Sequence, residues 1–142
     1  MKTRYTALVT VKKNIMQKSE RVLQAKNSNL HNAQAALEQS LQELNDIEAP
    51  KNGVIADFLS NRALLDTQRS MIDHNKEWVA FADQEVQEAK EQLKRDMIEY
   101  EKYQYLELQE LEAIKKKQKM QEAKELDEIA LMTFGKKERF AG

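Results

Sequence analysis

Apolar residues recur at every seventh position along two long stretches of the chain. A sustained heptad repeat is typical of a coiled coil, in which helices pack along one apolar seam. The pattern therefore predicts an all-α fold with two long helices, over about 4–47 and about 54–134. The predicted seam is one unbroken column in each helix: Val9, Met16, Leu23, Leu30, Leu37 and Leu44 in the first, and Phe58, Leu65, Ile72, Val79, Val86, Leu93 and Tyr100 in the second.

The neighbouring positions that would complete this seam are of mixed character. Some are apolar, such as Ala33, Ile47, Ala82 and Ala89. Others are polar and interrupt the second row, so the predicted seam is narrow. The interrupting residues are Lys12, Ser19, Lys26, Asn75 and Asp96.

A single cluster of helix-breaking residues lies between the two stretches, at 48–53. Pro50 cannot continue a helix, and Asn52-Gly53 tolerates the positive φ angles of a tight turn. The whole chain has only three glycines and one proline in 142 residues, so few other turns are available. We therefore predict one tight turn at 48–53 within a single coiled-coil domain, and a frayed tail over 135–142.

The two heptad columns are in register about this turn. If the helices fold back on each other, Leu30 lies opposite Ile72, and every other pair of column residues is likewise equidistant from residue 51. The phase of the columns and the position of the turn are independent features. Their agreement favours an antiparallel hairpin within one chain, although a domain-swapped or four-helix dimer stays open.

The same pairing leaves the second helix longer than the first. It is predicted to continue unpaired from about Tyr103 to Phe134, a length of roughly 45 Å at 1.5 Å per residue. Because helices in proteins are stabilised mainly by packing an apolar face, an unpaired helix with apolar residues at its end is a candidate docking element. That end carries Leu126, Ile129, Ala130, Leu131, Met132 and Phe134.

Composition narrows the function classes. The scarcity of glycine and proline argues against β-sandwiches, barrels and α/β enzymes, which need many turns. With 23 basic and 24 acidic residues the net charge is −1, which provides no general attraction to nucleic acid or to anionic membranes. The absence of cysteine excludes disulfides and thiolate metal sites and fits a reducing cytosol. No apolar stretch approaches the ~20 residues of a membrane span.

No residue pattern indicates catalytic or metal chemistry. His31 and His74 would need two further ligands to hold a metal, and both are interpreted as surface residues. No phosphate-binding loop, activated nucleophile or metalloprotease motif occurs. We therefore predict a protein without catalytic site, metal, cofactor or small-molecule substrate. The lysine-rich run at 115–119 is interpreted as a solvated helix face balanced by neighbouring acids, not as a nucleic-acid site.

Three short segments together match the pattern of a known family. They are Arg4–Val9 with Lys12-Lys13 at the start of the first helix, Asp57-Phe58-Leu59 after the turn, and Lys124–Ala130 before Phe134. With the length, the turn position and the overhanging second helix, nearly the whole chain resembles the FliJ family of flagellar type III export proteins, particularly as found in Campylobacter-like bacteria.

The resemblance implies a small, non-enzymatic, cytoplasmic coiled coil similar to the central stalk of rotary ATPases. Members of the family insert into the hexameric export ATPase, FliI, contact the export gate protein, FlhA, and help to handle chaperones of late export substrates. The protein would then lie at the cytoplasmic face of the inner membrane, associated with the membrane through its partners only.

The resemblance also implies two contact surfaces, assigned by their positions along the second helix. The gate-contact surface would be a stripe after the turn, formed by Leu64, Gln68, Met71 and Asn75. The alternative for Leu64 and Met71 is that they widen the seam, and Trp78 is interpreted as a residue that covers it. The ATPase-docking end would lie on the overhang, at Leu108, Leu111, Leu126, Ile129 and Phe134.

Two other functions fit the same residues. One is a structural or adaptor coiled coil that self-associates through the overhanging helix, without any ATPase. The other is a chaperone-like carrier for secreted subunits, which overlaps with the export role. A monomer in solution favours the stalk, and a stable dimer favours the self-associating adaptor.

Overall fold

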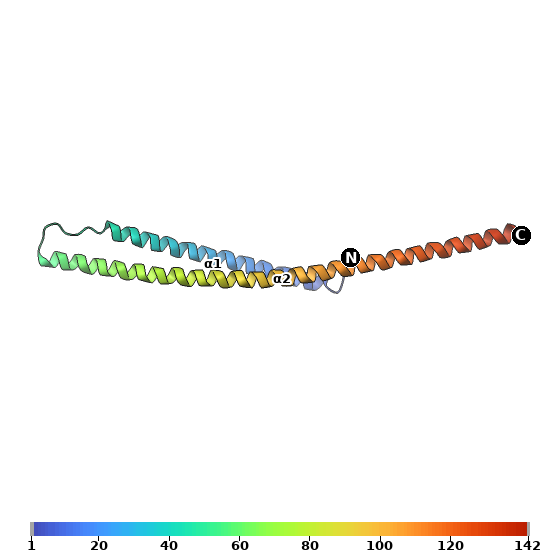
Figure 1. Cartoon of the computed structure of the whole chain (residues 1–142), viewed down its shortest axis with the longest axis horizontal. Helices are drawn as coiled ribbons and strands as arrows, with labels where there is room; N and C mark the ends of the chain where they lie inside the picture. Colours follow the sequence, from blue (N-terminus) through green and yellow to red (C-terminus); the bar gives the residue numbers. More distant parts are fainter. Residues whose placement is uncertain (1, 142) are drawn as a thin grey trace. The chain divides into compact units, whose positions relative to one another are not determined.

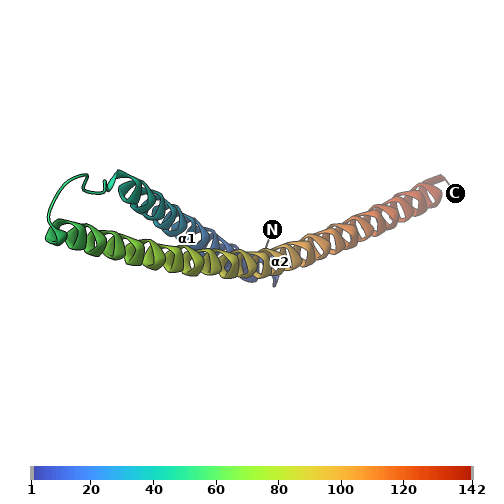
Figure 2. The same ribbon diagram turned by 60° about the vertical axis from the view of Figure 1, so that its left-hand side comes forward.

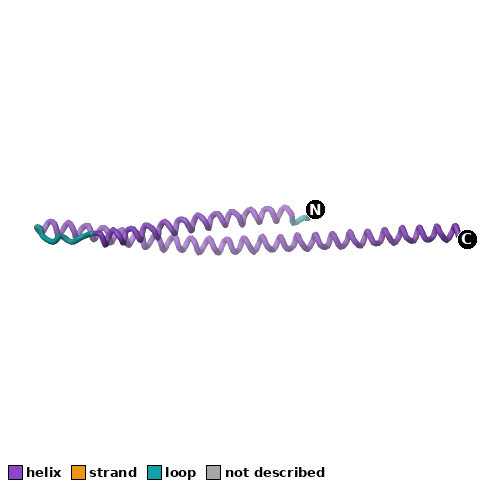
Figure 3. The backbone as a smooth tube through the Cα atoms, turned by 90° about the horizontal axis from the view of Figure 1, so that it is seen from above, coloured by secondary structure: helices purple, strands orange, loops and turns teal. Residues whose placement is uncertain are grey.

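The computed structural model describes residues 2–141, which form two α-helices and no β-strand (Figure 1). Helix α1 spans Thr6–Asp46 and helix α2 spans Ile55–Ala141. An eight-residue loop, 47–54, connects them and is drawn in teal between the helices in Figure 3. The predicted all-α fold, with two long helices that pack against each other, is confirmed.

Helix α2 continues past its predicted end at residue 134 and reaches Ala141. The expected frayed tail is therefore helical over 135–141, and Gly142 lies outside the described residues. A glycine such as Gly135 ends a helix when its backbone turns to positive φ, and no described residue has a positive φ. Without that conformation a glycine costs a helix about 1 kcal/mol but does not terminate it.

Contacts along the helices divide the chain into two compact units. Unit 1 comprises Met1–Lys13 and Ile98–Gly142, and unit 2 comprises Asn14–Met97. In unit 2, which contains the loop, the α1 and α2 segments run antiparallel, side by side (Figure 2). Each helix contributes a segment to both units.

The second heptad row, which the sequence shows as interrupted, is the most deeply buried part of unit 2. In α1, the leucines of the predicted seam column are half-buried. In the α2 column, Ile72 and Val86 are buried, whereas Leu65, Val79 and Leu93 are half-buried. In unit 1, Val9 and Tyr100 are also half-buried. The helices therefore approach most closely at small and polar residues, which are Ser19, Ala33, Ser40, Gln68, Asn75, Ala82 and Ala89.

The predicted register, centred on residue 51, is wrong. It places Lys26 opposite residue 76, whereas Lys26 Nζ lies 3.0 Å from Glu85 Oε2, nine positions farther along α2. At 1.5 Å per residue this is a displacement of about 13 Å. Two further cross-helix hydrogen bonds mark the observed register, from Ser19 Oγ to Asp96 Oδ2 and from Asn75 Nδ2 to Ser40 Oγ.

The prediction failed because a large side chain on one helix needs a small one opposite. The observed hydrogen bonds place Leu30 level with Ala82 instead of Ile72. They likewise place Leu23 level with Ala89. A bulky side chain then fits the hole left by a small one, which gives the close packing of protein interiors. The predicted register set two columns of large residues face to face, where they would hold the helices apart.

The connection at 47–54 is a loop without a tight turn. No described residue has a positive φ, so 52–53 does not take the predicted turn conformation. The loop instead lies along the start of α2, where Asn61 Nδ2 donates a hydrogen bond of 2.8 Å to the carbonyl of Glu48. Because the loop, and not α1, lies beside the first turns of α2, these turns are not covered by α1. Phe58, expected in the seam, is 48% exposed.

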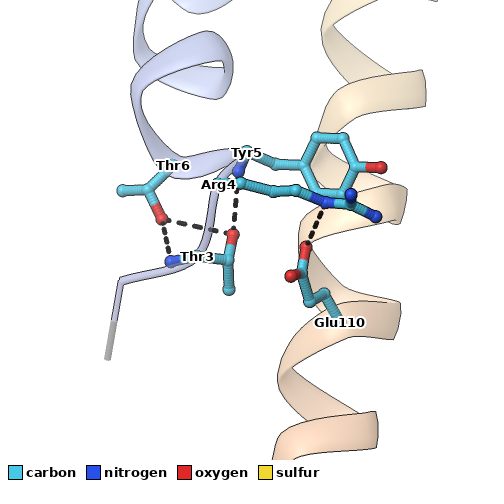
Figure 4. Close-up of polar contacts among 5 residues, drawn as sticks. All are labelled: Thr3, Arg4, Tyr5, Thr6 and Glu110. Atoms are coloured by element: carbon cyan, nitrogen blue, oxygen red, sulfur yellow. Dashed lines mark hydrogen bonds and ion pairs between the residues drawn. The ribbon is translucent and has the colours of Figure 1, made fainter.

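A reciprocal cap starts helix α1 in unit 1 (Figure 4). Thr3 Oγ1 accepts a hydrogen bond of 3.1 Å from the backbone N–H of Tyr5, and Thr6 Oγ1 accepts one of 2.9 Å from the N–H of Thr3. These bonds satisfy N–H groups that have no partner within the helix. The usual capping box has Glu or Gln where this chain has Thr6, so the cap is only weakly recognisable from the residue pattern.

The start of α1 packs against α2 within unit 1 through aromatic and charged side chains. Within this unit the antiparallel pairing reaches residue 110 of α2. The contacts are the Tyr5 and Tyr103 rings at 6.5 Å between centroids, Lys12 Nζ at 3.6 Å from Glu99 Oε2, and Arg4 Nε at 3.3 Å from Glu110 Oε2 (Figure 4).

Candidate docking surfaces

The unpaired end of α2 lies within unit 1. The ion pair between Arg4 and Glu110 marks the region where pairing with α1 ends. Leu111 and Ile114 are half-buried, whereas every residue from 115 to 134 is exposed. The unpaired segment therefore begins near residue 115 and not near 103, because the true register carries α1 farther along α2.

Apolar residues gather on this unpaired segment. Each of them is between 58% and 71% exposed, and the described residues provide no cover for them. Contiguous exposed apolar surface of this kind marks interaction sites in soluble proteins. We refer to this surface as the distal patch, which consists of Leu126, Ile129, Leu131, Met132 and Phe134.

The other two predicted docking residues form a separate surface. Leu108 is exposed and Leu111 is half-buried. Together with Tyr105 they line a shallow groove on α2 within unit 1. Leu108 lies 18 residues before Leu126, which corresponds to about 27 Å along the helix. The five predicted docking residues are therefore not one contiguous site.

The predicted gate-contact stripe divides into two exposed and two buried residues. Leu64 and Met71 are 53% and 48% exposed, whereas Gln68 and Asn75 are buried in the hairpin. Gln68 Nε2 donates a hydrogen bond of 2.8 Å to the carbonyl of Ser40, and Asn75 Nδ2 donates one of 3.2 Å to Ser40 Oγ. These two amides hold α2 to α1 and do not face solvent.

Two aromatic residues extend the exposed part of this stripe. Trp78 follows Leu64 and Met71 at seven-residue spacing, so the three residues share one side of α2. Trp78 is 40% exposed and Phe81 is 62% exposed, so Trp78 covers the seam only in part. The seven-residue spacing of Leu64, Met71 and Trp78 is present in the sequence. Trp78 was instead predicted to cover the seam, because it is adjacent to the seam residue Val79. We refer to Leu64, Met71, Trp78 and Phe81 as the proximal stripe.

The polar residues of the described chain do not gather into a metal site. His31 and His74 are both exposed, as the sequence suggested. Within residues 2–136, the part of the chain whose side chains the structure describes, no group of three or more His, Cys, Asp or Glu side chains is arranged to hold a metal ion. Over the same residues, neither helix has a stretch that is long and apolar enough to cross a membrane.

Comparison with known proteins connects this coiled coil to a family. The family model of the flagellar FliJ protein matches residues 1–139. The chain belongs to the FliJ family. FliJ proteins are structural components of the flagellar export apparatus and are not known as enzymes. Searches of curated proteins and of solved structures gave no match.

The FliJ match spans both the proximal stripe and the distal patch. Membership of the FliJ family therefore gives the chain a role in flagellum biogenesis and protein export. The two long packed helices agree with that membership. The proximal stripe in unit 2 and the distal patch in unit 1 are two of the exposed apolar surfaces of this FliJ-family chain.

Proposed function

We propose that this FliJ-family protein is a stalk that docks into the hexameric export ATPase, FliI, and links it to the export gate, FlhA. The observation that supports this best is the distal patch, which is exposed on a single unpaired helix. A helix without tertiary packing is only marginally stable in water. A partner that covers the distal patch would therefore both bind the end of α2 and stabilise it.

The dimensions of the unpaired segment suit a ring-shaped partner. A single α-helix is about 10–12 Å wide with its side chains, and residues 115–134 extend for about 30 Å. An element this narrow can enter the centre of a ring, and its apolar residues can be buried there. The charged residues between them, Asp127 and Glu128, keep the helix soluble before docking.

Contact with the export gate is proposed at the proximal stripe. Burial of Gln68 and Asn75 narrows the predicted contact to Leu64 and Met71, and the exposed aromatic Trp78 extends it. Tryptophan is one of the residues enriched in binding hot spots. The stripe belongs to unit 2 and the distal patch to unit 1, so the two partners use different parts of the chain.

Docking on both partners would bring the protein to the cytoplasmic face of the inner membrane through its partners only. Handling of export chaperones stays a prediction from the family resemblance. None of the surfaces described here is specific to a chaperone.

The ATPase contact is tested with the purified full-length chain and the hexameric ATPase. The double variant Ile129→Glu with Phe134→Glu should lose stimulation of the ATPase and bind it at least about tenfold more weakly, since each substitution removes buried apolar area. Leu64→Glu with Met71→Glu is the matched control, because it makes the same change on the proximal stripe.

The two double variants are expected to separate the two contacts. The proximal variant should stimulate the ATPase normally and lose binding to the isolated gate protein, and the distal variant should do the reverse. If the distal variant stimulates the ATPase as well as the unaltered chain does, the proposed docking at the distal patch is wrong.

The self-associating adaptor predicts a different result. In that case the distal patch would pair with a second copy of the chain, and the protein would be a dimer across a hundredfold dilution. Sedimentation or light scattering of the unaltered chain decides between the two. A stable dimer that Ile129→Glu with Phe134→Glu converts to a monomer would favour the adaptor and count against the stalk.

A further inference from the structure

Seven residues make hydrogen bonds across the seam of unit 2 through polar side chains. Four of them, Ser19, Ser40, Gln68 and Asn75, are buried, and polar groups in such positions are costly unless they are hydrogen-bonded. We refer to all seven as the polar set. It consists of Ser19 with Asp96, Lys26 with Glu85, and Ser40 with Gln68 and Asn75.

The apolar seam cannot by itself fix the register of the hairpin. Its columns repeat every seven residues, so sliding one helix by a heptad brings equivalent residues together again. Ala33 lies level with Val79 in the observed register. After a slip of seven residues it would lie level with Ile72 or with Val86, which are similar in size and character. Packing of the apolar residues is therefore nearly the same in all three registers.

The loop does not fix the register either. Helix α1 ends at residue 46, which lies level with about residue 65 of α2. Because α2 begins at residue 55, its first residue lies about 15 Å past the end of α1, measured along the helix axis. The nine Cα–Cα steps from 46 to 55 can span about 30 Å. A slip of one heptad moves one helix by about 10 Å along the other, which this loop can accommodate in either direction.

We propose that the polar set selects the register of unit 2, and that without it the hairpin also pairs one heptad away. The polar contacts are the part of the interface that does not repeat. If α2 slips by seven residues, Lys26 comes to lie beside Trp78 instead of Glu85. By the same slip, Asn75 lies beside Ala33 instead of Ser40. Both slipped contacts leave a polar group without its partner, and that mismatch disfavours the slipped register.

The absence of cysteine from the chain allows a direct test by disulfide formation. Ala33→Cys is combined with one of three partners. Val79→Cys reports the observed register, and Ile72→Cys and Val86→Cys report the registers one heptad to either side. In the otherwise unaltered full-length chain, the 33–79 disulfide should form at least about tenfold faster than the other two.

The same three reporters are then placed in a chain whose central polar contacts are removed by Ser40→Ala, Gln68→Leu and Asn75→Leu. The 33–72 or 33–86 disulfide should now form at a rate within about threefold of the 33–79 disulfide. The matched control makes the same kinds of change on the exposed surface of unit 2, with Gln39→Leu, Gln42→Leu and Ser70→Ala. It should keep the pattern of the unaltered chain.

A charge reversal gives a second, independent test if the triple variant fails to fold. Glu85→Lys places two lysines together and should raise the rates at which the 33–72 and 33–86 disulfides form. Adding Lys26→Glu should restore the rates of the unaltered chain. If the 33–79 disulfide dominates equally in every variant, the polar set does not select the register and the proposal is overturned.

Discussion

Asn75 donates a hydrogen bond from its side-chain amide to Ser40 Oγ across 3.2 Å, and both residues are buried between the two helices. A polar residue inside a coiled-coil seam gives up some packing but finds its partner in one register only. Apolar columns are the same at every heptad, whereas polar positions are not. The residues that interrupt the pattern therefore carry more information about pairing than the residues that make it.

Replacement of Ala33 by leucine tests the rule that large side chains lie opposite small ones. Ala33 is fully buried and level with Val79, so Ala33→Leu should lower the free energy of unfolding by about 1–3 kcal/mol through overpacking. The control, Ala35→Leu, adds the same side chain at an exposed position and should change stability little. Urea unfolding followed by circular dichroism measures both. Equal stability of the two variants would contradict the register described here.

The heptad columns, together with the single break at 48–53, were sufficient to predict both helices, their antiparallel pairing and an overhang. The register could not be predicted in this way. It depends on matching volumes across the interface, such as Leu30 against Ala82, and on which polar groups meet, such as Lys26 and Glu85. The symmetric position of the turn was misleading because an eight-residue loop need not place the two helix ends level with each other.

The candidate surfaces were predictable to a similar extent. The distal patch was visible in the sequence because residues beyond the reach of α1 are exposed in any hairpin of this kind. In the proximal stripe, Leu64 and Met71 are exposed but Gln68 and Asn75 are buried. Which side of α2 faces α1 depends on the exact position of the seam. The row of small and polar residues that defines this position interrupts the apolar heptad pattern, so the pattern did not identify it as the seam.

The ion pair between Lys26 and Glu85 is expected to contribute little to stability. Its charged atoms are 3.0 Å apart, but the side chains are 32% and 28% exposed, so solvent weakens the attraction. A double-mutant cycle with Lys26→Ala and Glu85→Ala should give a coupling energy of about 0.5–1 kcal/mol, which falls at 1 M salt. A coupling above about 2 kcal/mol would show that the pair is better shielded from water than its exposure indicates.

The cap at the start of α1 should stabilise the first turns of that helix in unit 1. Thr3→Ala removes the acceptor for the Tyr5 N–H and should cost about 1 kcal/mol. Thr3→Ser keeps the hydroxyl and should cost much less. Thr10→Ala is a control at an exposed position whose hydroxyl bonds only within the helix. Hydrogen exchange of the amides at 5–10 is the measurement, and equal exchange in the Thr3→Ala and Thr10→Ala variants would argue against the cap.

The unpaired end of α2 should open far more readily than the paired part. Residues 115–134 are all exposed, whereas 72–89 include the most buried positions of α2. Because a lone helix in water lacks the packing that stabilises helices in proteins, the amides of 115–134 should exchange with solvent at least about a hundredfold faster than those of 72–89. Hydrogen exchange followed by mass spectrometry measures both segments in one sample.

The same measurement tests whether a partner covers the distal patch. Addition of the hexameric ATPase should slow exchange across 115–134 in the unaltered chain but not in the variant Ile129→Glu with Phe134→Glu, because that variant lacks the apolar contacts that would hold the helix. Exchange at 72–89 serves as the internal control and should not change in either protein. Protection at 115–134 that is already complete without any partner would mean that the segment is packed in solution, either on another part of the chain or on a second copy.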